Sequence, residues 1–369
     1  AMHWPYYQYQ TARGARRSAL HDRLVAAGAC MGEVAGWERP NWFAAPGSSP
    51  RYEYSYGRQN WFDACRDECL AVRDAVALFD QSCFPKFLVQ GADACALLNE
   101  LSTANVDVPP GRIVYTQWLN ERGGIEADLT ITRLSEREFM VVTSAICQTR
   151  DLAWLRRHLE DRPDARCSVT DVTSGVAMLG VMGPRSRDLL QALSGADLSN
   201  AAHPFGHSRE IGIGYARVRA SRITYVGELG WELYLPTEHC LDVYERLVDA
   251  GSGAGLKLAG YHAMGACRVE KGYRHWSHDI GDEDTPLEAG LGFTVSWDKP
   301  GGFLGRDALL QQRAGGTLRR RLVQLMLDDA SDAAPLLYHE EPIVRDGEIV
   351  GSVRSGSWGH RIGRSIGMG

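Results

Sequence analysis

A single aspartate within a strongly alternating segment is the residue whose type and position most clearly predict chemistry. Two β-rich runs, Ile113–Leu119 and Ile125–Leu134, flank a turn at Asn120–Gly124, whose paired glycines accept backbone conformations that other residues avoid. In the second run apolar and polar side chains alternate, and Asp128 lies on the polar face. A period of two predicts a half-buried strand, yet aspartate is depleted in strands. Asp128 therefore either points to water with its polar neighbours or lines a cavity as its working carboxylate.

A second carboxylate has a similar context further along the chain. In residues 224–236 a strand is followed by a glycine turn and then by an acidic residue, Glu232, early in the next strand. Alternation places Glu232 on the same face as Tyr234. Glu232 is either exposed to solvent or, together with Asp128, part of a shared cavity.

Motifs for several other kinds of chemistry are absent from the sequence. It contains no GxGxxG strand–helix unit, no GxxxxGK[ST] phosphate loop and no GxSxG nucleophile elbow. A cysteine nucleophile stays open, since nothing pairs one cysteine with one histidine. Cys65 and Cys69 lie four residues apart without a second pair, so core packing is favoured. His275, His278 and Asp279 lack both HExxH spacing and a third distant ligand, and no metal site is predicted.

The composition is that of an ordinary globular protein and excludes some classes of partner. Of the 369 residues, 44% are hydrophobic and 23% are charged, with a net charge of −6, which argues against a nucleic-acid binder. No apolar run reaches the roughly 20 residues that span a bilayer, so no membrane partner is expected. The nine scattered cysteines favour reduced thiols in a cytosol-like compartment.

The coarse order of elements predicts an α+β fold. Apolar residues at steps of three and four predict a helix over residues 62–79, and strands and helices alternate to about residue 190. Strands at 216–220, 223–226 and 231–235, followed by a helix at 239–249, repeat the theme. This repetition suggests two related α+β halves.

Three segments of the chain differ in texture. Residues 1–50 are rich in aromatic side chains and are expected to be a packed strap, either over the body or belonging to a neighbouring domain. Residues 51–315 carry the two α+β halves. Residues 316–369, after the linker Gly315-Gly316, are expected to be a small β domain, with a hairpin turn at Asp346-Gly347 and a final strand that reads as cut short.

Six segments of the chain occur in one order. They are GWERPNWF (36–43), VRDAVALFD (72–80), YTQWLNERGGIEADLTITRL (115–134), LGVMGPRSRDLL (179–190), TYVGELGWELYLP (224–236) and RVEKGYRHWSHDI with TPLEAGLGF (268–293). In this order they resemble the tetrahydrofolate-binding half of the dimethylglycine and sarcosine dehydrogenase/oxidase family, which is itself similar to the glycine-cleavage aminomethyltransferase, or T-protein. Each motif alone is modest, but six in order are specific.

The resemblance implies the aminomethyltransferase fold and a reaction. The fold consists of two ferredoxin-like α+β domains and a small C-terminal β-barrel around a central folate cavity. In the reaction an N-methyl amine of the dimethylglycine or sarcosine type is oxidised at a flavin, and tetrahydrofolate captures the carbon as 5,10-methylenetetrahydrofolate. FAD is expected only on a domain absent from this chain or on a partner subunit, with residues 1–50 as a linker from it. The implied location is the cytoplasm, or the mitochondrial matrix in a eukaryote.

The resemblance also assigns roles to the two carboxylates. Asp128 matches the family's catalytic aspartate, which serves as a base or a negative partner for the folate amine nitrogens. Glu232 matches the glutamate that binds the pterin, whose adjacent N–H and NH2 groups suit one carboxylate. Tyr115 and Tyr225 lie where the family has aromatic residues that line the cavity.

Three further residues are assigned to folate binding. Ser144 falls where T-proteins often carry Asn. Arg268 contacts the ligand or forms a structural ion pair, both of which remain open. Arg361, or its neighbour Arg364, is expected to serve the glutamate tail, because Met264 occupies the position of a T-protein arginine.

Other functions remain possible on the same scaffold. They are a folate-dependent O- or S-demethylase, the glycine-cleavage aminomethyltransferase itself, and a folate-binding protein without catalysis. Met264 and residues 36–43 argue against the T-protein itself.

Overall fold

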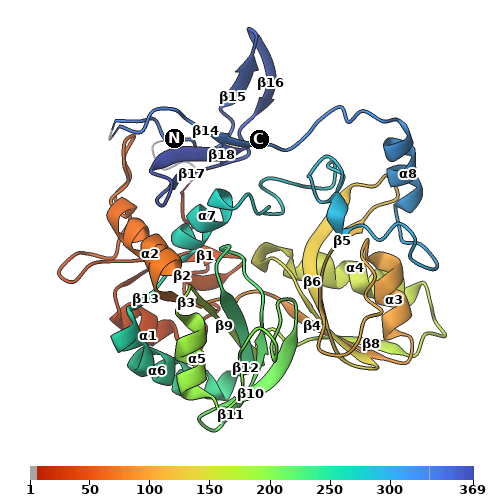
Figure 1. The fold of residues 1–369 in the computed structure, drawn as a ribbon, viewed down its shortest axis with the longest axis horizontal. Coiled ribbons are helices and arrows are strands. Elements are labelled where there is room, and N and C mark those ends of the chain that lie inside the picture. Colours follow the sequence, from red (N-terminus) through yellow and green to blue (C-terminus); the bar gives the residue numbers. More distant parts are fainter. Residues whose placement is uncertain (1–5, 332) are drawn as a thin grey trace.

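The structure, a computed structural model that describes residues 6–331 and 333–369, contains two α+β domains side by side and a small β domain near the C-terminus (Figure 1). The α+β class predicted from the sequence is confirmed. No helix in the described part of the chain is long and apolar enough to cross a membrane.

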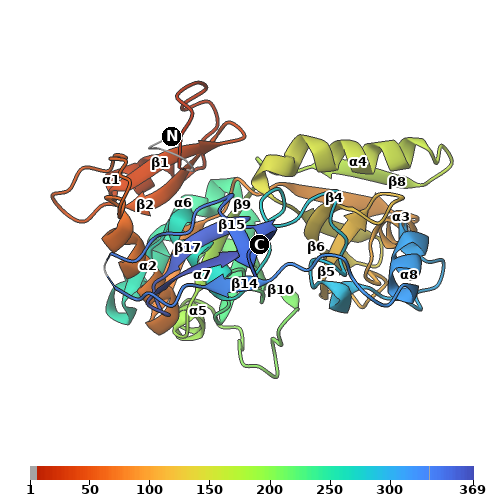
Figure 2. The same ribbon diagram turned by 90° about the horizontal axis from the view of Figure 1, so that it is seen from above.

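A five-stranded antiparallel sheet forms one domain. In spatial order its strands are β5 (Ile113–Leu119), β6 (Ile125–Ser135), β7 (Glu138–Val142), β4 (Lys86–Gly91) and β8 (Cys167–Asp171). Helices α3 (Ala94–Leu101) and α4 (Gln148–Glu160) cover one face, as Figure 2 shows for α4. The buried cluster on that face includes Phe87, Trp118 and Leu129. Because side chains alternate along a strand, Asp128 lies on the opposite, uncovered face.

A six-stranded mixed sheet forms the other domain. In spatial order its strands are β10 (Ser208–Ile213), β11 (Ala216–Ser221), β12 (Gly230–Pro236), β9 (Val176–Met182), β3 (Val76–Asp80) and β13 (Leu256–Leu258). Helices α5 (Ser186–Leu193) and α6 (Cys240–Gly251) pack on one face. Helices α2 (Phe62–Asp74) and α7 (Tyr261–Glu270) cover the β3 end of the other face.

Two predicted elements were wrong. The helix expected over residues 62–79 ends at Asp74, and Val76–Asp80 is strand β3, buried throughout. A short, continuously apolar run fits a buried strand as well as a helix, and β3 finds partners in β9 and β13. The strand expected at residues 223–226 is irregular chain, stabilised by the Thr224 hydroxyl, which accepts hydrogen bonds from the backbone N–H groups of Val226 and Gly227.

The sequence suggested two α+β halves that follow one another in the chain, but the two domains are not consecutive. Strand β3 pairs with β9 in the six-stranded sheet, and all five strands of the other sheet lie between them in the chain. The six-stranded domain is therefore built from two separated segments.

The N-terminal segment is more regular than expected. After α1 (His21–Ala26), β1 (Ala29–Val34) and β2 (Trp37–Phe43) form a hairpin. This hairpin lies on the six-stranded domain, away from α3 and α8 (Figure 2), and its Trp42 is buried against α2 and α7. That these residues lead from a flavin domain stays a prediction.

The C-terminal segment carries the predicted β domain. It follows α8 (Arg306–Ala314) and contains β14 (Gln324–Met326), β15 (Pro342–Arg345), β16 (Glu348–Ser352), β17 (Ser355–Gly359) and β18 (Arg364–Met368). Among the described residues these strands form one three-stranded sheet and one hairpin. The hairpin turn at Asp346-Gly347 is confirmed, with φ of 54° and 83°.

The turn between β5 and β6 is fixed by the segment that follows α7. The Asn120 side chain caps the turn by accepting the Gly124 N–H at 3.0 Å, and its amide donates to the Asp282 carbonyl at 3.1 Å. The Trp276 indole donates to the Ile125 carbonyl at 2.8 Å. A Cβ on Gly124 would lie 1.8 Å from the Asp282 oxygen, so only glycine allows this approach.

This contact predicts the effect of Gly124→Ala. The added methyl must push the two segments apart, and we expect the free energy of unfolding to fall by about 1–3 kcal/mol, as for overpacking. Denaturant-induced unfolding measures the change. Gly212→Ala, where a Cβ meets nothing within 4 Å, is the control. Equal stability of the two variants would contradict the account.

Candidate functional site

Asp128 is held by side chains from the neighbouring strand. Gln117 lies directly opposite Asp128 in the β5–β6 ladder, and Tyr115 is paired with Thr130 on the same face. The Gln117 amide donates to Asp128 Oδ1 at 2.8 Å, and the Tyr115 hydroxyl donates to Oδ2 at 3.1 Å. Both carboxylate oxygens therefore have fixed donors, and the register of the hairpin sets them in place.

The orientation of the Gln117 amide is itself fixed. Its Oε1 accepts hydrogen bonds from the hydroxyls of Thr294 and Thr103. An amide whose oxygen accepts in this way presents its NH2 to the remaining neighbour. Gln117 is fully buried, so it holds Asp128 as a rigid donor.

Aromatic and basic groups surround the carboxylate on its open side. Tyr225 and Arg274 lie within electrostatic range of Asp128, and the Tyr225 hydroxyl donates to the Arg274 carbonyl at 2.7 Å. The ring of Tyr115 is 6.4 Å from that of Phe293, and the two residues are 36% and 76% exposed. Asp128 itself is only half-buried. The carboxylate thus lies behind aromatic side chains that solvent reaches.

The surroundings change the acidity of Asp128. Desolvation raises its pKa to about 6, against the opposing effects of Gln117, Tyr115 and Arg274. A carboxylate with a raised pKa near aromatic groups suits proton transfer close to neutral pH.

Glu232 lies on β12 of the other sheet and is nearly fully buried. The Tyr234 hydroxyl donates to Glu232 Oε2 at 2.6 Å, and burial raises the pKa of Glu232 to about 7. Its neighbour in the ladder on β9 is Gly180, where a Cβ would lie 2.2 Å from the side-chain oxygen of the buried Gln81, so Gln81 fills the space at this position. Among the described residues no donor is seen on Oε1, so Glu232 can accept from a ligand.

The two carboxylates lie on surfaces that face each other. Met140 and Val142 share the face of Asp128, since they pair with Thr132 and Thr130. They form one buried cluster with Met178 and Tyr234 of the six-stranded sheet, and Tyr234 shares its face with Glu232. Asp128 and Glu232 therefore point toward the region between the two sheets and not to the outer surface of either domain.

Two basic residues of this region were not singled out from the sequence. Lys86 on β4 is fully buried, lies within electrostatic range of Glu232 and has a pKa lowered to about 8 by burial. Arg274 follows α7, and two of its nitrogens donate to the carbonyls of Ala289 and Gly272 at 2.9 and 2.6 Å. A lysine within an otherwise apolar strand was the available indication for Lys86, whereas a loop arginine is ordinarily solvated.

The remaining predicted residues are not all brought to Asp128. Ser144 lies just beyond β7, where its hydroxyl is hydrogen-bonded to the Cys147 thiol, which is within electrostatic range of Asp128. Arg268 is buried in an ion pair with Asp279 and donates to the Ser355 hydroxyl at 2.8 Å. This is the structural ion pair considered for Arg268, and the residue lies within electrostatic range of Tyr225.

Arg361 lies on the turn between β17 and β18. It forms an ion pair with Asp74 at 3.2 Å, and its backbone N–H donates to Glu270. Arg364 donates to the carbonyls of Leu327 and Asp328. Neither is placed beside Asp128 by a contact, so binding of the glutamate tail by these arginines stays a prediction.

Two surface hollows in the structure lie away from both carboxylates. The larger, about 600 Å³, is beside Lys299 and residues 301–307, and the smaller, about 280 Å³, is beside Arg16, Trp37 and Thr237. The folate cavity between the sheets remains a prediction, and the evidence for it is that Asp128 and Glu232 lie on faces that point toward each other.

Comparison with known families matches nearly the whole chain. The GCVT N-terminal domain matches residues 20–299, and the glycine cleavage T-protein C-terminal barrel domain matches residues 320–369. The boundary between the two matches lies close to the linker expected at residues 315–316.

Two characterised relatives are much longer than this chain. The 4-methylaminobutanoate oxidase (formaldehyde-forming) of Paenarthrobacter nicotinovorans is 47% identical over 368 residues, which cover 100% of this chain and 44% of the relative. Human mitochondrial sarcosine dehydrogenase is 37% identical over 404 residues, 99% of this chain and 43% of the relative. The chain thus spans less than half the length of these relatives.

A solved structure has the same fold over nearly the full length. The glycine cleavage system aminomethyltransferase T from Bartonella henselae superposes with a TM-score of 0.80 at 25% identity, covering 96% of this chain and 89% of that one. The resemblance and the aminomethyltransferase fold inferred from the sequence are confirmed. This chain belongs to the glycine cleavage T-protein family.

Proposed function

We propose that this chain carries out tetrahydrofolate-dependent one-carbon transfer, capturing the carbon released when an N-methyl amine is oxidatively demethylated. The product is 5,10-methylenetetrahydrofolate. The observation that carries the proposal is Asp128, a carboxylate between two sheets with two fixed donors and a raised pKa. The names of the relatives, an oxidase and a dehydrogenase of N-methyl amines, support a donor of the dimethylglycine or sarcosine class.

Asp128 and Glu232 have separate roles in this proposal. Glu232 accepts hydrogen bonds from the pterin edge through Oε1, while Tyr234 holds Oε2. Asp128 takes up or balances the proton of the folate amine as the carbon is transferred. Tyr115 and Phe293 stack on the ring system, since Tyr115 donates to Asp128 and the Phe293 ring lies beside the Tyr115 ring.

A flavin supplies the oxidation step when it is present, on another domain or on a partner subunit. The residues described here hold the acceptor and manage its protons. Lys86 stabilises ionised Glu232 by its charge, and Arg274 does the same for Asp128.

One observation favours a second candidate. The name of the 47% identical relative includes "formaldehyde-forming", the outcome expected when the oxidised carbon is hydrolysed and not captured. In that case the chain binds folate without efficient transfer. Product analysis separates the two, because capture yields methylenetetrahydrofolate at the expense of formaldehyde.

Asp128→Asn tests the proposed base. The amide can keep the hydrogen bonds to its neighbours but cannot accept the proton, so we expect folate binding to persist and transfer to fall by about 10²–10⁴-fold. Single-turnover transfer to tetrahydrofolate, in the presence of the flavoprotein that supplies the oxidised amine, measures this. Glu210→Gln, an exposed carboxylate on the edge strand β10, is the control. An unchanged transfer rate in Asp128→Asn would remove Asp128 from the reaction.

Glu232→Gln tests the pterin contact. Losing the charged acceptor is expected to weaken tetrahydrofolate binding by about 1.5–3 kcal/mol, the usual contribution of a hydrogen bond to a charged group. Isothermal titration calorimetry with tetrahydrofolate or folinic acid reads the affinity. If Glu232→Gln and Glu210→Gln bind as tightly as the unaltered chain, Glu232 does not contact the ligand.

The pH dependence of transfer follows from the raised pKa of Asp128. Since that pKa is about 6, the carboxylate is protonated below this pH and ionised above it. The base form is lost as pH falls, so the rate should drop by up to about tenfold per pH unit on the acidic side. This fall in rate at acidic pH should be absent from the residual activity of Asp128→Asn. If the transfer rates of both proteins fall in the same way at acidic pH, the fall is caused by another titrating group.

A further inference from the structure

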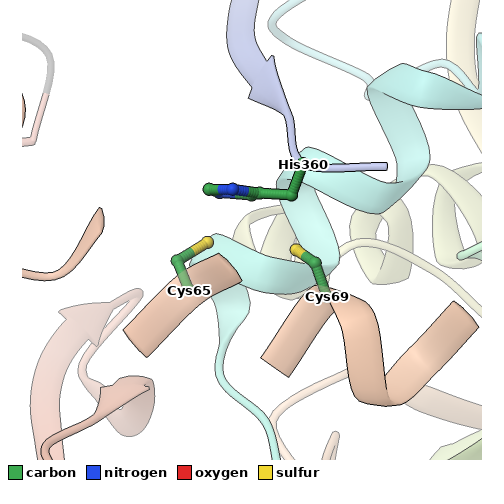
Figure 3. A group of neighbouring side chains, drawn as sticks. All are labelled: Cys65, Cys69 and His360. Atoms are coloured by element: carbon green, nitrogen blue, oxygen red, sulfur yellow. The ribbon is translucent and has the colours of Figure 1, made fainter. Parts of the chain in front are cut away.

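A cluster of cysteine and histidine side chains lies outside the proposed folate site. Cys65 and Cys69 are one turn apart on α2, and His360 comes from the turn between β17 and β18, almost at the other end of the sequence. Figure 3 shows the imidazole beside both thiols, which point toward it. One potential ligand atom from each residue lies within 4.8 Å of the other two.

The spacing is close to that of a metal centre. With bonds of about 2.3 Å to sulfur and about 2.0–2.1 Å to nitrogen, tetrahedral ligand atoms are roughly 3.5–3.8 Å apart. From separations of up to 4.8 Å, the three donors therefore need to approach one another by at most about 1.3 Å, which side-chain rotation can supply.

The histidine has a ring nitrogen that a metal would satisfy. His360 Nδ1 is buried and has no hydrogen-bond partner among the described residues. A buried nitrogen without a partner is unfavourable, and coordination would satisfy it.

A candidate for the fourth ligand lies beside Cys69. Cys267 on α7 is fully buried and its thiol interacts with the Cys69 thiol, but it lies outside the group of three whose donors are all within 4.8 Å of one another, so its side chain has to move to complete the site. Cys69 also makes a long contact to the Ala263 carbonyl, at 3.7 Å. Three cysteines and one histidine form one of the ligand sets of structural zinc sites.

We propose that Cys65, Cys69, Cys267 and His360 bind a zinc ion that ties the C-terminal β domain to α2 and α7. Sulfur and imidazole ligands select zinc over magnesium or calcium, which prefer oxygen. The thiols bind as thiolates, so each coordinated cysteine releases its proton to solvent as its bond to zinc forms. The site is structural and separate from Asp128 and Glu232.

The neighbouring contacts already hold His360 in position. Arg361, the next residue, forms an ion pair with Asp74 at the end of α2 and donates its N–H to Glu270 at the end of α7. The turn is thereby fixed on both helices without metal. Zinc adds a link at the same place and should raise the stability of the docked β domain.

The test uses the reduced chain, stripped of metal by a chelator and then titrated with Zn²⁺ or with Co²⁺ as a coloured probe. We expect one zinc per chain, release of protons to a pH indicator, and a thiolate-to-cobalt charge-transfer band. Zinc should also raise the thermal midpoint. Cys65→Ser/Cys69→Ser should lower zinc affinity by at least about 100-fold, the upper end of what outer-shell changes cost. Cys95→Ser, on α3 of the other domain, should change nothing.

His360→Gln covers the case in which the double cysteine variant does not fold, because His360 lies on a turn and is only partly buried. It should weaken zinc binding and remove the effect of zinc on the thermal midpoint. The proposal is overturned if the reduced chain takes up no zinc, or if His360→Gln binds zinc as tightly as the unaltered chain and the Cys95→Ser control do. A Cys65–Cys69 disulfide without zinc uptake after reduction would also overturn it. Folate titration of the same proteins should be unaffected, which separates this result from the proposed function.

Discussion

The pairing of β5 with β6 is the constraint on which the candidate site depends. A shift of one residue in this ladder would turn Asp128 to the face covered by α3 and α4 and bring Ala127 to its place. The turn at Asn120–Gly124 prevents the shift, because it is held by Asp282 and Trp276 from the segment after α7. The same register sets Gln117 opposite Asp128. One local interaction thus positions the carboxylate, its donors and the segment that carries Arg274.

The candidate site also depends on the five-stranded and the six-stranded sheet facing each other. Each sheet buries one face under its own helices, and the remaining faces meet through Met140, Val142, Met178 and Tyr234. The carboxylates lie on these inner faces, where desolvation raises the pKa of both. An inner face that carries acids, tyrosines and a buried lysine is poorly suited to a simple packing contact and well suited to a polar, aromatic ligand.

Much of this arrangement could be predicted from the sequence, because the strongest patterns are local. The alternation in residues 125–134 predicted β6 and the face of Asp128, and the Asp346-Gly347 turn predicted the β15–β16 hairpin. Residues 76–80 were misassigned because periodicity cannot separate a short buried strand from the end of a helix. The partners of β3 lie far away in the chain, beyond the reach of a local pattern.

The same limit explains the site residues that were missed or misplaced. Folding brings three residues, Lys86, Gln117 and Arg274, close to the carboxylates. Their spacing in the sequence does not indicate these contacts. For Arg268, a structural ion pair was one of two open interpretations, and the structure supplies Asp279 as its partner. Cys65 and Cys69 are core residues, as the sequence predicted, but their spacing gave no indication that His360 would lie beside them.

The central claim is that Asp128 and Glu232 face one bound pterin from two sheets. A crystal structure of this chain with folinic acid tests it most directly. The account predicts the pterin between β6 and β12, with its donor edge on Glu232 and its amine nitrogens within hydrogen-bonding distance of Asp128. A ligand bound elsewhere, with both carboxylates facing only water or protein, would contradict it.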